Sequence, residues 1–135
     1  MENHFYRLMV LQNSVKELLK KDDIETALTH IFDFIEANQG YFESRIHMSA
    51  AIQISATAHR LRNAFHQGHI AWELTNRVRR SLIDECLSVL EYLKRDFEES
   101  MYQKRSYPHI GGLPNLSMVQ RALEKIEQIL SPYIR

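Results

Sequence analysis

The stretch HRLRNAFHQGHIAWE, residues 59–73, contains the turn between two predicted helices. Before it, apolar side chains recur every three or four residues from Ile46 to Phe65, and after it they recur from Val78 to Phe97. That period is typical of an α-helix with one apolar face. Gly68 stands between the two runs, where a glycine ends a helix at low cost in backbone strain. The stretch therefore predicts two consecutive helices joined by a corner at Gly68.

The same period predicts two helices before this pair. The first carries its apolar stripe from Phe5 to Leu18 and ends at Lys20, where a positive charge suits the negative end of the helix dipole. Asp22 is then placed to cap the second helix, and Glu25 three residues later would complete a capping box. The expected core positions of this second helix are Ile24, Ala27, Leu28, Ile31 and Ile35.

A last helix is predicted near the C-terminus. It follows a loop over residues 101–116 that holds two glycines and two prolines, and Ser131-Pro132 closes it. We expect its inward side chains to be Met118, Ala122, Leu123, Ile126 and Leu130.

No segment alternates with period two, so the sequence predicts an all-α fold. We expect a four-helix bundle over residues 1–100, a Pro/Gly loop over 101–116 and a C-terminal helix over 117–135. The third helix is rich in small side chains and is the expected centre of the bundle. The apolar stripe of the fourth helix is broad enough to contact more than one neighbour.

Composition describes an ordinary single domain. The chain has 135 residues, 44% hydrophobic and 25% charged, and its formal net charge is zero. A neutral chain has no overall attraction to nucleic acid or anionic lipid, so we expect neither as a partner. One cysteine, no signal-peptide pattern and no apolar run of membrane-spanning length predict a cytoplasmic protein.

An arginine with nearby histidines in the opening stretch suggests one catalytic alternative. Helical ribonucleases of the HEPN class carry an arginine, a polar residue, and a histidine four to six positions later. Arg62 could act with His66 or His69 in this way, the imidazole as acid or base and the guanidinium stabilising the phosphate. Both residue types are common on solvated helix faces, so the preferred interpretation is that they flank a turn.

Other chemistry has weaker support in the sequence. His66, His69 and Glu73 have ligand-like spacing, with His59 earlier, but Gly68 separates them, and we predict no metal site. Cys86 lies on the apolar stripe of the fourth helix and is expected to be a buried hydrophobe. The two adjacent glycines after residue 110 follow no strand and lack the lysine of a phosphate loop, so no cofactor is predicted.

Charge is unevenly distributed around the corner. Five arginines gather there, opposed only by Glu73, and an acidic stretch follows. Opposite charges on separate surfaces favour docking between copies or partners. The predicted interface comprises Arg60, Arg62, Trp72, Arg77, Arg79, Arg80, Asp84 and Glu85.

Three stretches together carry a family-like pattern: ELLKKDDIETALTHIFDF (17–34), IQISATAHRLRNAFHQGHIAWE (52–73) and NRVRRSLID (76–84). They resemble the effector-associated domains of bacterial conflict systems, most nearly the subtype numbered eleven, over about residues 15–93. Asp22 stands where a glycine is usual, and Ala71 replaces the serine that would cap the fourth helix. The Asn76-Arg77 element also sits about one helical turn closer to Gly68 than in the family. The matching positions are Leu18, Leu19, Asp23, Ile24, Ala27, Leu28, Ile54, Ser55, Leu61, Gly68, Ile70 and Glu73.

The resemblance implies an adaptor without catalytic activity. Domains of this kind are thought to bind like copies and to join a sensor to an effector, such as a protease or a TIR enzyme. The expected partner is therefore a protein with a similar helical domain, including a second copy of this chain. The resemblance also implies that Leu61 and Ile70 turn inward at the corner.

Overall fold

The structure, a computed structural model, describes residues 2–38, 44–103 and 116–133. This part of the chain contains five helices and no strand, which confirms the predicted all-α class. The helices are α1 (Glu2–Lys20), α2 (Ile24–Ala37), α3 (Ser44–His66), α4 (Trp72–Gln103) and α5 (Leu116–Leu130).

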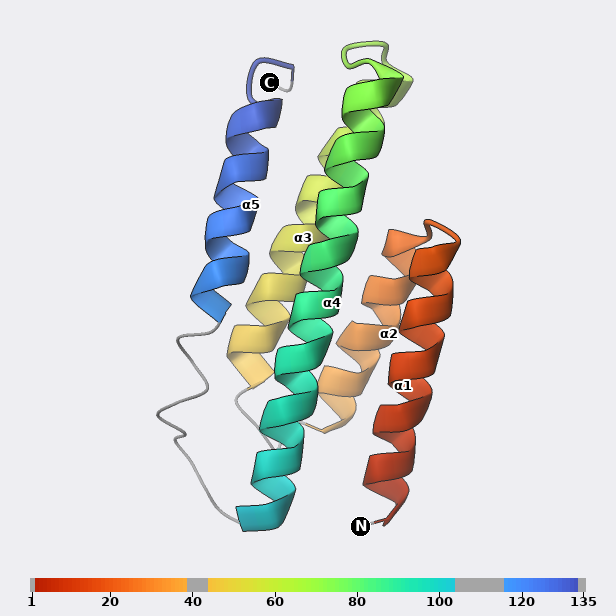
Figure 1. The fold of residues 1–135 in the computed structure, drawn as a ribbon, viewed down its shortest axis with the longest axis vertical. Coiled ribbons are helices and arrows are strands. Elements are labelled where there is room, and N and C mark those ends of the chain that lie inside the picture. The colour runs from red at the N-terminus through yellow and green to blue at the C-terminus, as the bar shows by residue number, and fades with distance from the viewer. Residues whose placement is uncertain (1, 39–43, 104–115, 134–135) are drawn as a thin grey trace.

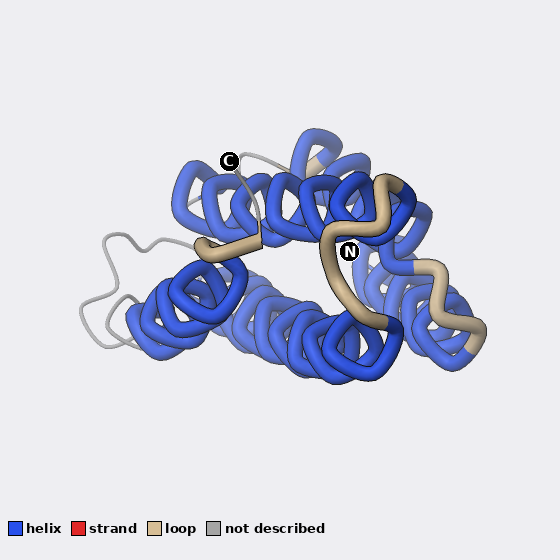
Figure 2. Tube along the Cα trace, turned by 90° about the horizontal axis from the view of Figure 1, so that it is seen from above, coloured by secondary structure: helices blue, strands red, loops and turns tan. Residues whose placement is uncertain are grey.

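The helices form two layers, with α1, α4 and α5 in front of α2 and α3 in the view of Figure 1. Consecutive helices run in opposite directions (Figures 1 and 2). α3 packs against α2, α4 and α5, and α4 packs against each of the other four helices. The breadth of the α4 apolar stripe predicted such multiple contacts. In this structure α5 packs against α3 and α4 of its own chain.

A continuous apolar core lies between the layers. On α4, every stripe position predicted from Val78 to Phe97 at the main core spacing is at most 3% exposed. Burying one such side chain stabilises the fold by roughly 1.5–3 kcal/mol. At the end of the core where α2 stops, the rings of Phe34 and Phe97 meet edge to face at 5.4 Å. The α4 core positions are Val78, Leu82, Cys86, Val89, Leu93 and Phe97.

The corner after α3 has the geometry that its glycine predicts. Gly68 adopts φ +78°, and its N–H donates to the carbonyl of Phe65 at 3.0 Å. The N–H of His69 donates to the carbonyl of Ala64 at 2.8 Å. These two bonds form a Schellman motif, which satisfies carbonyls that the end of a helix leaves free. Leu61 and Ile70 are buried, as expected.

The corner after α1 uses the same motif without a glycine. Asp22 adopts φ +64°; its N–H donates to the carbonyl of Leu19, and the N–H of Asp23 donates to that of Leu18. The prediction that Asp22 caps α2 is therefore wrong. Asp23 is the cap, and its carboxylate accepts from the N–H of Thr26 at 3.2 Å. Asp22 instead ends α1, because a residue in the left-handed conformation can reverse the chain there.

Two helix boundaries and one side-chain position also differ from the sequence expectations. α4 extends to Gln103 and α5 begins at Leu116, so both enter the region predicted as loop over 101–116. Residues 104–115 of that loop lie outside the described residues. Met118 is 65% exposed rather than inward, and its neighbour Val119 is buried in its place. The face of α5 is thus rotated by one residue at its first turn.

Candidate interaction surfaces

The arginines around the α3–α4 corner are not opposed only by Glu73, as the sequence suggested. Three of them form ion pairs with carboxylates on other segments of the same chain. Arg60 pairs with Glu127 of α5, and Arg62 lies 3.9 Å from Glu25 of α2. The prediction failed because these carboxylates are far away in sequence and close only in the folded chain.

Arg79 makes the most extensive of these contacts. Its Nε lies 3.1 and 3.0 Å from the two carboxylate oxygens of Asp22, and its Nη2 donates to the Asp22 carbonyl at 2.6 Å. Only 14% of the Arg79 side chain is exposed. Arg79 therefore connects α4 to the α1–α2 corner, and its main role is to stabilise the fold.

Among the aromatic and basic members of the predicted interface, Trp72, Arg77 and Arg80 stay exposed without an ion pair in the described part of the chain. Trp72 is 58% exposed at the start of α4, and its ring lies 5.6 Å from that of half-exposed Phe65 on α3. Arg77 and Arg80 follow on the outer surface of the first turns of α4. We call Phe65, Trp72, Arg77 and Arg80 the corner surface.

The two acidic members of the predicted interface lie in different surroundings. Asp84 is exposed on α4. Glu85 is half-buried, and this burial, with the neighbouring charge of Asp84, raises the pKa of its carboxyl.

The residues of the ribonuclease alternative do not form one pocket. Arg62 and His66 are exposed one turn apart on α3, and Arg62 is turned to Glu25. His69 lines a different hollow of about 430 Å³ with Arg60, Asn63 and Tyr133, to which Arg62 does not contribute. The arrangement therefore gives no specific support to a site built from Arg62 with His69.

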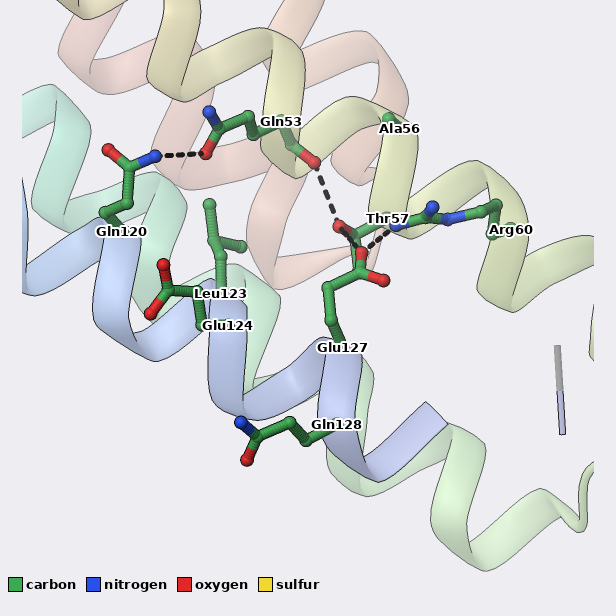
Figure 3. Close-up of a pocket in the computed structure, with 9 residues that line it drawn as sticks. All are labelled: Gln53, Ala56, Thr57, Arg60, Gln120, Leu123, Glu124, Glu127 and Gln128. Atoms are coloured by element: carbon green, nitrogen blue, oxygen red, sulfur yellow. Dashed lines mark hydrogen bonds and ion pairs between the residues drawn. The ribbon is translucent and has the colours of Figure 1, made fainter. Parts of the chain in front are cut away.

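A groove runs between α3 and α5, and most of the residues that line it have polar side chains (Figure 3). Its volume is about 360 Å³. Thr57 and Arg60 of α3 both reach toward Glu127 of α5, and the Thr57 hydroxyl donates to Glu127 Oε2 at 2.9 Å. Nearer the start of α5, Gln120 contacts Gln53 at 3.5 Å. These contacts join the two groove walls, and we assign them to the docking of α5.

A second groove lies between α1 and α4 and is mainly apolar. Its volume is about 380 Å³, and Leu19, Ile83 and Leu87 form its apolar lining. Lys16 and Lys20 line the α1 side. Leu87 is 36% exposed, so this strip of apolar surface is open to solvent. The sequence did not predict this groove, which stays open because α1 packs only weakly against α4.

A buried polar contact between α3 and α4 was not predicted from the sequence. His47 Nε2 lies 2.9 Å from Asp96 Oδ2, and both residues are buried where α3 begins and α4 approaches its end. Buried polar groups keep their place by hydrogen bonding, so this contact fixes the relative position of the two helices. The two residues are 49 positions apart, and no local pattern predicts their contact.

Cys86 is fully buried in the core, as predicted. Burial raises the pKa of its thiol to about 12, so the thiolate needed for a nucleophile is scarce at neutral pH. Within the described residues, no group of three or more His, Cys, Asp or Glu side chains could hold a metal ion.

No helix in the described ranges has the length and apolar character needed to cross a membrane. Comparisons of this chain with protein-family models, with curated proteins and with solved structures found no significant match. Inferences about function therefore rest on the surfaces described above.

Proposed function

We propose that this chain is a non-catalytic helical adaptor that associates with chains bearing a similar helical domain, including its own copies. Its resemblance to effector-associated domains supports a role in a bacterial defence or signalling system. The packed helices act as a rigid scaffold, and the function is carried by its surfaces rather than by a reactive centre.

The corner surface is the observation that supports the proposal. Tryptophan and arginine are the side chains that contribute most often to binding energy at the centres of protein interfaces. Here an exposed tryptophan packs on a phenylalanine, and Arg77 and Arg80 follow within three helical turns. Arg60, Arg62 and Arg79 are already paired within the chain, so the corner surface is the part of the predicted arginine interface left for a partner.

Light scattering over a wide range of protein concentration tests the proposal. We expect the wild-type mass to rise above 16.0 kDa with concentration. Reversing two charges with Arg77→Glu and Arg80→Glu should lower the mass at a given concentration without unfolding the bundle. Arg121→Glu with Lys125→Glu is a matched control, because these exposed cations lie on α5, away from the corner surface.

Two results would overturn parts of this proposal. A wild-type protein that stays monomeric to about millimolar concentration contradicts self-association. RNA cleavage by the purified protein that is lost when His66 and His69 become alanine would replace the adaptor by the ribonuclease alternative.

A further inference from the structure

The aromatic pair of the corner surface is extended by the ring of a histidine. The Phe65 ring lies 5.6 Å from that of Trp72 and 6.0 Å from that of His66, the last residue of α3. His66 and Trp72 are exposed, and Phe65 is half-exposed. α3 and α4 extend past the α1–α2 corner at this end of the molecule (Figure 1). We call His66, Phe65 and Trp72 the ring cluster.

Charged side chains around the ring cluster come from each element that meets there. On α3, Arg62 lies one turn before His66 and is turned to Glu25 of α2. The first turn of α4 contributes Glu73, followed by the two arginines of the corner surface and then by Asp84. Within the described ranges, none of the carboxylates forms an ion pair with His66. A proton on this imidazole is therefore balanced by water rather than by a neighbouring side chain.

The other histidine of the corner has different surroundings. His69 lines the hollow that Arg60 and Tyr133 also line, on the side of the bundle where α5 ends. It forms no ring contact with Phe65 or Trp72 among the described residues. His66 is thus the corner histidine that belongs to the aromatic surface.

We infer that the ring cluster makes self-association sensitive to pH: copies of this chain join through it while His66 is neutral and separate as His66 takes up a proton. This inference rests on the proposed association through the corner surface and names its regulation. A contact that covers Phe65 and Trp72 also removes the adjacent imidazole from water. Removing a charged imidazolium from water without a carboxylate partner is unfavourable, whereas removing the neutral ring costs much less.

The direction and size of the effect follow from linkage. The proton binds the free chain better than the associated chain, so a lower pH favours free chains. Histidine side chains change charge between about pH 8 and pH 5. In a two-fold contact each copy brings one His66. If the contact excluded the proton from both, the dissociation constant would rise about a hundredfold between pH 7.5 and pH 5.5, and partial burial gives a smaller rise.

Light scattering at constant ionic strength tests the inference. We expect the dissociation constant of the wild-type protein to rise at least about tenfold between pH 7.5 and pH 5.5. His66→Gln keeps a neutral polar side chain at both pH values, so its dissociation constant should change less than about threefold. Circular dichroism at both pH values would verify that each protein stays folded.

His69→Gln is the matched control. It removes a histidine three residues away, at an exposed position that lines the other hollow. Because the ring cluster is intact in this variant, the tenfold rise of the wild-type protein should remain, to about the same extent. The comparison of the two variants separates proton uptake at the ring cluster from a general effect of acid on the protein.

Three results would overturn the inference and leave the proposed function standing. They are association with a constant dissociation constant over this pH range, association that strengthens in acid, and a pH dependence that His66→Gln retains. Association that strengthens in acid would show that the imidazolium meets a carboxylate of the second copy. A wild-type protein that stays monomeric at both pH values overturns the inference and the proposed self-association together.

Discussion

The corners at Asp22 and Gly68 share one backbone motif and have opposite surroundings. In each, a residue with positive φ ends a helix with the same two backbone hydrogen bonds. The Asp22 corner is held by Arg79 of α4 through its carboxylate and its carbonyl. The Gly68 corner has open space around its α-carbon and leaves Trp72 exposed beside it. The Asp22 corner thus packs against α4, whereas the Gly68 corner leaves a surface that a partner protein could contact.

Removing Arg79 should produce the largest change in stability. Arg79→Ala removes charged hydrogen bonds to Asp22 and leaves that residue in the left-handed conformation without its main contact. We expect the free energy of unfolding to fall by about 2 kcal/mol, measured by urea titration. Arg80→Ala is the control; this exposed side chain has no ion pair among the described residues, so the change should stay within about 0.5 kcal/mol. Equal effects of the two variants would contradict a structural role for Arg79.

A substitution at Gly68 should cost less, because only backbone strain is involved. No atom lies within 4 Å of a Cβ built at this position, so Gly68→Ala causes no steric clash. The left-handed φ of +78° should still lower the free energy of unfolding by about 1 kcal/mol. The mass at a given concentration should be unchanged, which light scattering would check. A neutral effect on stability would show that the corner relaxes to another conformation.

The starts of α2 and α4 extend the comparison to helix capping. Asp23 caps α2 with its carboxylate, whereas α4 begins after Ala71, whose carbonyl accepts from the N–H of Thr75 at 3.0 Å. Ala71→Ser should therefore add about 1 kcal/mol to the free energy of unfolding, and Asp23→Ala should remove a similar amount. Thermal denaturation of both variants measures this. No gain from Ala71→Ser would mean that its hydroxyl does not reach the free N–H groups of the first turn.

The sequence predicted those features that neighbouring residues determine. Helical periodicity identified the α-helices, and Gly68 marked its corner because glycine is the residue that most easily takes positive φ. The sequence did not reveal the corner at Asp22. Aspartate is also a common helix cap, and the partner of Asp22, Arg79, is 57 positions away. The candidate surfaces were predicted less well for the same reason. Whether an arginine is free or paired depends on carboxylates such as Glu127, which only folding brings near.

The smallest change in the free energy of unfolding is expected from Asp22→Gly, which gives both corners a glycine. This substitution also tests the comparison of the two corners most directly. In the wild-type protein, Asp22→Gly relieves the strain at φ +64° but removes the carboxylate that contacts Arg79. The two terms oppose each other, so we expect a net loss of only about 0.5 kcal/mol. In an Arg79→Ala background no ion pair remains to be lost. The same substitution should then stabilise the fold by about 0.5–1 kcal/mol.

The sign change between the two backgrounds separates backbone strain from the ion pair. Urea titration of the four proteins gives a double-mutant cycle, and its coupling energy measures the contact between the Asp22 and Arg79 side chains. Additive effects would mean that the carboxylate contributes nothing and that Arg79 acts through the Asp22 carbonyl, which Asp22→Gly retains. A coupling energy near 1 kcal/mol would show that the side-chain pair offsets the strain of an aspartate in a glycine conformation. The α1–α2 corner would then owe its stability to α4, whereas the corner at Gly68 needs no such support.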